Sequence, residues 1–220
     1  MQQINGRDAA LAVLNDPTFV VPPVPPASAG VAWLRATVGR FSSGEAHQRR
    51  RALSSAILDA IPLESLCDQG PVHPVAVLAR EMGVGEPVVN LVRDVAQAYQ
   101  PDTGDEPRAD AAVDRLVAVL GGAFDEPTAA RIGVLVQAYQ PTIALIERTR
   151  GRPVDDVLRD DPPVPATKRQ ALVGTTVGDV TVDAGEVVRV RLAGDLAFGS
   201  GPRRCPGREH ALALVEGALA

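Results

Sequence analysis

Apolar residues recur every three or four positions through the first 150 residues, which is the spacing of amphipathic helices. Proline and glycine punctuate the pattern, because proline cannot continue a helix and glycine weakens one. The pattern predicts helices over residues 8–14, 31–38, 44–60, 74–82, 87–99, 109–120 and 128–149. We expect Pro141 to interrupt the last helix. In the 44–60 helix the apolar stripe consists of Ala52, Leu53, Ala56, Ile57 and Ala60.

The pattern changes after Gly151, where short runs of β-branched residues separated by glycine predict strands. These strands are expected at residues 171–173, 180–182 and 187–192, between a short helix at 154–158 and a final helix at 206–218. The predicted fold class is therefore mainly α with a small β-sheet (α+β).

One pentapeptide, Gln-Ala-Tyr-Gln-Pro, occurs twice, at residues 97–101 and 137–141. Both copies lie at or near predicted helix breaks. The sequence holds no third copy, so the pattern does not indicate a solenoid of repeats.

Composition limits the function. The chain has 220 residues and a net charge of −5, so it is long enough for one large domain or two small ones, and nucleic acid is not expected as a partner. No apolar run approaches the ~18 residues of a membrane span. Residues 1–16 lack the pattern of an export signal, so we expect a cytoplasmic protein. Two cysteines are too few for a disulfide framework.

The residues best suited to chemistry surround Cys205, which lies in a glycine-rich loop at the start of the final predicted helix. The N-terminus of a helix stabilises a thiolate through its unpaired N–H groups and its dipole. Gly201 and Gly207 allow the backbone to approach something flat and bulky, and Arg203 could pair with an anion beside the sulfur. No second cysteine is nearby, so the pattern favours a soft metal bound through one sulfur over zinc or an iron–sulfur cluster.

The pattern Phe198-x-x-Gly201-x-Arg203-x-Cys205-x-Gly207 resembles the haem-ligand signature of the cytochrome P-450 superfamily, with all five positions filled. The resemblance implies a truncated P-450-like fold, with residues 1–220 as a single haem-binding domain. In that domain residues 1–150 are helical, and residues 151–220 hold the small β patch, the cysteine loop and the final helix. It also implies haem b (iron protoporphyrin IX) as cofactor, with Cys205 as the metal ligand.

Further residues resemble family positions that bind the haem propionates. His47 and Arg51 are four apart and share one face of a helix, as such a pair requires. Arg169 stands where a propionate-binding arginine belongs. Asp156 and Arg159 resemble the family's Glu-x-x-Arg pair, and we expect them to form at least a helical ion pair.

The chain also departs from the family. It is about half as long as a usual member, and only residues 193–197 separate the last predicted strand from the cysteine motif, so it is expected to be either a compact variant or an incomplete relative. Gln140 and Pro141 replace the acid and the first threonine of the distal acid–threonine pair, and Thr142 remains as the second. Thr142 and Gln140 are therefore the candidate catalytic residues. Gln140 cannot relay a proton as a carboxylate does.

The resemblance implies an oxidoreductase that oxidises a small organic molecule in bacterial specialised metabolism. The oxidant would come from dioxygen through a ferredoxin and its reductase (monooxygenase) or from peroxide (peroxygenase), and the missing acid favours peroxide. Two alternatives stay open. One is a non-catalytic haem-binding sensor or auxiliary protein, which substrate turnover would exclude; the other is a haem-free interaction module, which a copurifying red colour would exclude.

Overall fold

The structure is a computed structural model, which describes residues 1–67, 70 and 72–220. The chain divides into two compact units by its internal contacts. The sheet unit comprises residues 1–22 and 148–205, and the helical unit comprises residues 23–147 and 206–220. The change of pattern predicted near residue 150 thus coincides with a boundary between the units. The N-terminal segment belongs with the strands, which the local pattern did not predict.

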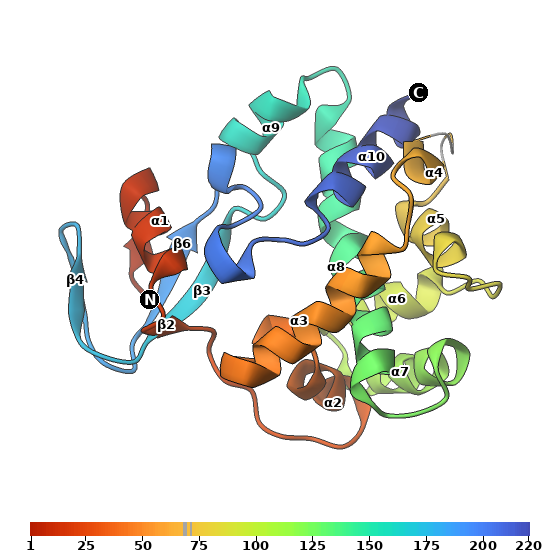
Figure 1. Cartoon of the computed structure of the whole chain (residues 1–220), viewed down its shortest axis with the longest axis horizontal. Coiled ribbons are helices and arrows are strands. Elements are labelled where there is room, and N and C mark those ends of the chain that lie inside the picture. The colour runs from red at the N-terminus through yellow and green to blue at the C-terminus, as the bar shows by residue number, and fades with distance from the viewer. Residues whose placement is uncertain (68–69, 71) are drawn as a thin grey trace. The chain divides into compact units, whose positions relative to one another are not determined.

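The sheet unit is built on four strands in the order β1-β6-β3-β2 (Figure 1). β1 pairs with β6 in parallel, so the first residues of the chain join a strand formed much later. The pairs β6–β3 and β3–β2 are antiparallel, and β4 and β5 form a separate hairpin. The strands are β1 (Gln3–Ile4), β2 (Phe19–Val20), β3 (Ala166–Ala171), β4 (Thr175–Val177), β5 (Val180–Val182) and β6 (Val187–Arg191).

Helices and 3-10 turns complete the sheet unit: α1 (Arg7–Asn15), α9 (Val154–Asp160), η2 (Gly194–Leu196) and η3 (Gly201–Arg203). α1 packs on β6 and also contacts η3. The buried core joins α1 to the sheet; its apolar members include Ile4, Val13, Leu14, Phe19, Val188 and Val190. Burial of these side chains stabilises the small unit.

The strand predictions were correct for residues 180–182 and nearly so for 187–192, but wrong for residues 171–173. The strand there is β3, which ends at Ala171, and Leu172 and Val173 are 56% and 51% exposed. The polar sequence of β3 conceals its periodicity, because its buried positions are Arg169 and Ala171. Strands β1 and β2 were not predicted, since each has only two residues.

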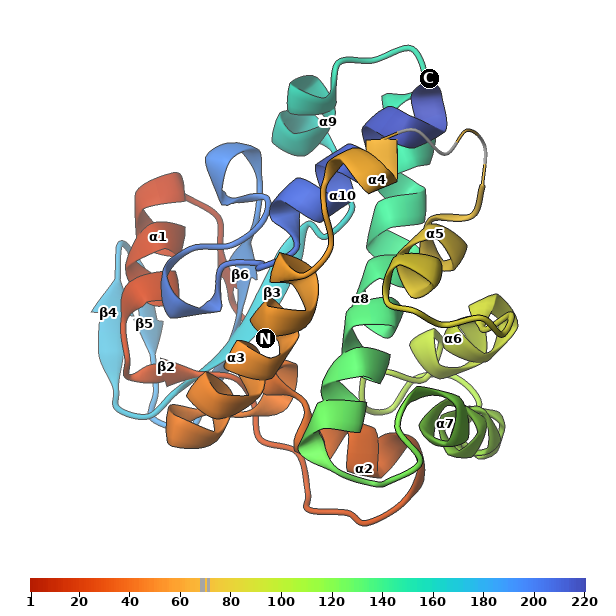
Figure 2. The ribbon, with the colours of Figure 1, turned by 45° about the vertical axis from the view of Figure 1, so that its right-hand side comes forward.

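The helical unit holds the larger core. Its elements are α2 (Gly30–Thr37), η1 (Gly39–Phe41), α3 (Gly44–Asp59), α4 (Glu64–Cys67), α5 (Pro74–Glu81), α6 (Val89–Ala96), α7 (Glu106–Leu120), α8 (Glu126–Thr149, whose last two residues belong to the sheet unit) and α10 (Arg208–Leu219). The long α8 runs beside α5, α6 and α7 in both views (Figures 1 and 2). No helix among the described residues is long and apolar enough to cross a bilayer.

Two expectations for these helices were wrong. α8 continues through Pro141 without interruption. Proline removes a single N–H donor, and buried side chains on both sides, among them Leu135 and Leu145, hold the flanking turns. The apolar stripe of α3 does not form its buried face either: the stripe's three alanines are exposed, and the buried residues are His47 and Leu58. Alanine favours helix formation on any face, so it marks the buried face poorly.

Candidate functional site

The loop from Phe198 to Cys205, called the cysteine loop below, closes on itself through backbone hydrogen bonds. The Cys205 N–H donates to the Phe198 carbonyl at 2.8 Å, and the Arg204 N–H donates to the Gly201 carbonyl at 3.1 Å. Cys205 itself is exposed. The loop therefore satisfies its own backbone while it presents the cysteine, which is what a ligand-bearing loop requires.

Glycine is required at residue 201 for two reasons. Its φ of +62° is a left-handed conformation that other residues rarely adopt. A Cβ built there would also lie less than 3.0 Å from the side chain of Asn15 in α1. Gly199 has a similar φ of +74°, but a Cβ there would lie 3.6 Å from the nearest atom, an ordinary contact. The close approach of Gly201 is therefore made to α1, a local reason for glycine that the sequence did not reveal.

Arg169 is 5% exposed, although it lies in a strand of only six residues. Its guanidinium donates to Thr167 Oγ1 at 2.9 Å and to the Lys168 carbonyl at 2.8 Å. A guanidinium keeps its charge when it is buried, and its planar shape matches that of a carboxylate. The sheet unit thus contains five predicted site residues: Arg169, Phe198, Gly201, Arg203 and Cys205.

The other predicted site residues belong to the helical unit: His47, Arg51, Gln140, Thr142 and Gly207. His47 is buried in α3, and Arg51, one turn later, is half-buried. Gly207 has a φ of −94°, which any residue adopts, and a Cβ there would only touch Leu58 at 3.6 Å. Nothing within its own unit therefore requires glycine at residue 207.

The neighbouring arginines of α3 have a different task. Arg49 and Arg50 both bind the carboxylate of Glu126 in the first turn of α8, at 2.7 Å and 2.8 Å. The hydrogen bond from Arg49 lowers the pKa of Glu126 to about 2, with a second from Arg50 acting in the same direction. The three consecutive arginines thus have different contacts. Arg49 and Arg50 bind α8 through Glu126, whereas Arg51 shares a helix face with His47.

The two candidate catalytic residues of α8 have opposite exposures. Thr142 is 3% exposed, whereas Gln140 lies at the surface. Two residues span roughly 200° of helical rotation, so the side chains leave the helix on different faces. Both residues were expected to face one distal pocket, and these orientations favour Thr142 alone for a buried role.

The predicted ion pair between Asp156 and Arg159 is present in α9. Their side chains are 40% and 61% exposed, so this is a surface pair and contributes little to stability.

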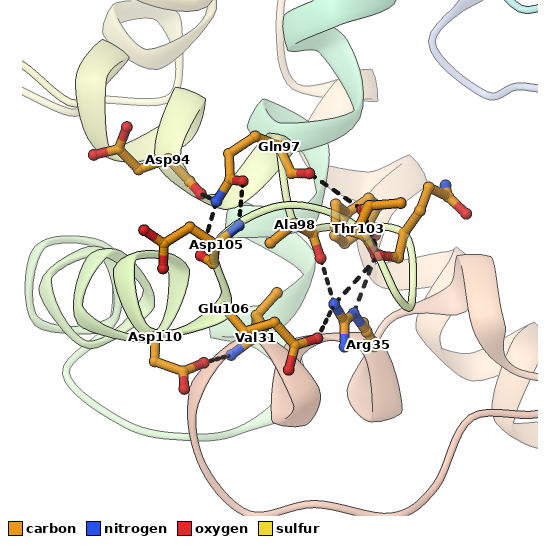
Figure 3. Close-up of polar contacts among 11 residues, drawn as sticks. Val31, Arg35, Asp94, Gln97, Ala98, Thr103, Asp105, Glu106 and Asp110 are labelled. Carbon is orange, nitrogen blue, oxygen red and sulfur yellow. Dashed lines mark hydrogen bonds and ion pairs between the residues drawn. The ribbon is translucent and has the colours of Figure 1, made fainter.

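A buried polar junction between α2, α6 and α7 was not predicted from the sequence (Figure 3). Arg35 is 7% exposed and pairs with Glu106 at 2.7 Å, while it also donates to the carbonyls of Ala98, Tyr99 and Gln100. We call this cluster the Arg35 junction. The junction has no short sequence motif that would predict it, because three of its acceptors are backbone carbonyls, which every residue carries.

Glycines and side-chain acceptors complete the Arg35 junction (Figure 3). Gln97 accepts from the Asp105 N–H at 2.7 Å, and a Cβ on Gly104 would overlap the Gln97 side chain. The Tyr99 hydroxyl is the exception. It is buried with no hydrogen-bond partner among the described residues, and burial raises the pKa of Tyr99.

Over the part of the chain that the structure describes, no group of three or more His, Cys, Asp or Glu side chains gathers where it could hold a metal ion. The donor set around Cys205 is instead one sulfur with arginines in the same unit. Such a set suits a metal that brings its other ligands within a prosthetic group bearing carboxylates.

Neither a scan of protein-family models nor a search of curated proteins gave a match to this sequence. Solved structures do match. The chain is similar to CalO2 (TM-score 0.72, 16% identity, 99% of this chain and 81% of that chain). It is also similar to P450BioI in complex with an acyl carrier protein ligated to hexadec-9Z-enoic acid (TM-score 0.66, 17% identity, 98% of this chain and 82% of that chain). A third match is the cytochrome P450 TxtC, described as hydroxylating thaxtomin (TM-score 0.65, 16% identity, 99% of this chain and 83% of that chain).

These likenesses show the fold. The chain has a cytochrome P450-like fold in a shortened form, mostly helical with small sheets, as the motif around Cys205 predicted.

Proposed function

We propose that this protein is a haem-thiolate oxidoreductase in which Cys205 is the axial ligand. The observation that carries the proposal is the cysteine loop: its backbone is closed by the bond from the Cys205 N–H to the Phe198 carbonyl, and its cysteine is exposed. The cytochrome P450-like fold supports the same reading, since the chain matches such structures over 98% or more of its length.

The residues present fit the proposed cofactor. Haem needs one protein sulfur and cationic partners for two propionates. The sheet unit offers Cys205 with Arg169 and Arg203, and the helical unit offers His47 and Arg51 on one helix face. Phe198, Gly201 and Gly207 are the proposed backbone and ring contacts of the cofactor. When bound through a thiolate, haem supplies the oxidising chemistry, because electron donation from sulfur favours O–O cleavage.

The chain's own residues have the tasks of binding, orientation and proton delivery. Arg169 is buried and charged, so its guanidinium can hold a carboxylate in a fixed position. Thr142 is the proposed proton-handling group, because its hydroxyl both donates and accepts. Gln140 is at the surface and does not exchange protons, so dioxygen activation through reductase is expected to be slow. We therefore propose peroxide as the effective oxidant, with ferredoxin-driven turnover as the weaker route.

The substrate class is a small organic molecule in specialised metabolism. This proposal rests on relatives such as TxtC, which is described as hydroxylating thaxtomin. One relative was solved with an acyl carrier protein, so a carrier-bound substrate is a specific form of the same proposal.

The deciding experiment is the visible spectrum of haem-supplemented protein, reduced under carbon monoxide. We expect the red-shifted Soret band typical of thiolate ligation. The Cys205→Ser variant should lose this band, while Cys67→Ser should keep it, because both variants remove one thiol and only one removes the ligand. An unchanged band in Cys205→Ser, or no haem uptake by the natural sequence, would overturn the proposal.

A haem-binding sensor or auxiliary protein is the second candidate, and one observation favours it. The acid of the distal pair is Gln140, and it lies at the surface. Turnover measurements with peroxide separate the two functions. Oxidation of any trial substrate that depends on Cys205 supports the enzyme, whereas haem binding without turnover across a substrate panel supports the sensor.

A further inference from the structure

A polar pocket of about 310 Å³ lies in the sheet unit, at the edge of the paired strands β1 and β6. All of its lining residues belong to this one unit. The polar members of the lining are Gln3, Asn5, Asp160, Asp161, Arg189 and Arg191. None of these residues has a part in the proposed haem site.

The strand register gathers positive charge on the exposed face of the sheet. Arg189 and Arg191 are two residues apart in β6, so both point to the same face, roughly 7 Å apart along the strand. Lys168 of β3 is the cross-strand partner of Arg189 on that face, and Gln3 of β1 is its partner on the other side. Like charges placed opposite each other destabilise a sheet, so an anion bound on this face would offset their repulsion.

The carboxylates in the pocket do not supply that anion. Asp160 pairs with Arg159 at 3.1 Å and with Arg152 at 3.7 Å. Asp161 pairs with Arg148 at 3.4 Å. Within residues 1–67, 70 and 72–220, neither Arg189 nor Arg191 forms an ion pair. The pocket therefore holds two carboxylates that are paired with other arginines and two guanidinium groups that form no ion pair within the described residues.

We propose that this pocket binds the phosphate group of a small metabolite, with Arg189 and Arg191 as the paired clamp. Guanidinium groups match phosphate oxygens in a two-pronged geometry. Gln3 and Asn5 also line the pocket, and their side chains carry amide groups that can serve as neutral donors. A volume of about 310 Å³ is large enough for a small phosphorylated molecule.

Titration calorimetry of the full chain tests this proposal, with inorganic pyrophosphate, inorganic phosphate and citrate as probes at one fixed ionic strength. We expect saturable binding of one pyrophosphate per chain, tighter than citrate. Arg189→Gln and Arg191→Gln should each weaken pyrophosphate binding by about tenfold or more, since each removes a charged hydrogen-bond donor. The double variant should bind at least about a hundredfold more weakly.

The matched control is Arg115→Gln, which removes the same charge from an exposed position of α7 in the other unit. It should bind pyrophosphate as the natural sequence does. Circular dichroism checks that all variants fold. We expect them to fold, because Arg115, Arg189 and Arg191 are all exposed. No saturable binding by the natural sequence, equal weakening in Arg115→Gln, or tighter binding of citrate than of pyrophosphate would overturn the assignment.

Discussion

The cysteine loop and the Arg35 junction share one structural feature, a glycine packed against a side-chain amide, but they differ in what they expose. Each places a glycine in a left-handed conformation against a side-chain amide, with Gly201 on Asn15 and Gly104 on Gln97. In the junction Arg35 is 7% exposed, and its guanidinium is bound by Glu106 and by backbone carbonyls. In the loop the backbone groups bind one another, and Cys205 is exposed.

This difference separates scaffold from site. A buried charge is tolerated only when several partners satisfy it, so the Arg35 junction fixes three helices in one arrangement. The cysteine loop is closed by backbone hydrogen bonds, and Cys205 lies at the surface. Variants of Arg35 should therefore change stability, whereas variants of Cys205 should change chemistry more than stability.

The largest stability effect is expected at Arg35. Arg35→Met should lower the free energy of unfolding by about 2–4 kcal/mol, because it leaves three carbonyls without their donor, whereas the half-exposed Glu106 can be solvated. Urea denaturation followed by circular dichroism measures this change. Arg115→Met, at an exposed position, should change stability by less than about 0.5 kcal/mol. Similar losses in the two variants would show that the junction is not the scaffold described here.

The second effect tests the loop with a pair of glycines. Gly199→Ala and Gly201→Ala share the cost of a left-handed conformation, about 1–2 kcal/mol each. Gly201→Ala adds the overlap with Asn15, so it should be the more destabilising, and the added loss should shrink in an Asn15→Ala background. Thermal unfolding of the four variants measures this coupling. Equal losses in both backgrounds would contradict the close packing of the loop on α1.

The repeated pentapeptide shows how far sequence reasoning reaches. Residues 97–101 form a turn after α6, whereas the same five residues at 137–141 lie inside α8. Identical local preferences thus give two structures, and the surrounding packing decides between them. This is why the helix break expected at Pro141 was wrong, while most other helices were predicted to within a few residues.

The candidate site was predictable in part for a related reason. The motif around Cys205 depends on spacing along the chain, so the sequence reveals it directly. The Arg35 junction and the pairing of β1 with β6 depend on contacts between distant segments, and their residues carry no local signal. The exposures of Gln140 and Thr142 likewise follow from the packing of α8 and not from their order in the sequence.

An intermediate effect is expected from the ion pairs of Arg49 and Arg50 with Glu126. The Glu126 side chain is neither as buried as Arg35 nor fully exposed. The pKa of Glu126 is lowered to about 2, so the carboxylate stabilises the fold above its unfolded value near 4.5 and this stability is lost as pH falls toward 2. After allowance for solvent screening, we expect about 1–2 kcal/mol at neutral pH. Glu126→Gln should remove this loss from the pH profile of urea denaturation. If Glu126→Gln and the natural sequence lost the same stability between pH 5 and pH 2, the role of Arg49 and Arg50 would be contradicted.

The smallest effect is a gain, and it tests whether the Arg35 junction is complete. The Tyr99 hydroxyl is buried with no partner among the described residues, and the ring packs edge-on against Phe41 at 5.3 Å. Tyr99→Phe keeps the ring contact and removes an unsatisfied polar group, so it should stabilise the protein by about 1 kcal/mol. Tyr139→Phe, at a half-buried position of α8, is the matched control and should be neutral. A loss of stability in Tyr99→Phe would mean that the hydroxyl has a partner, such as a bound water, and that every polar group of the junction is satisfied.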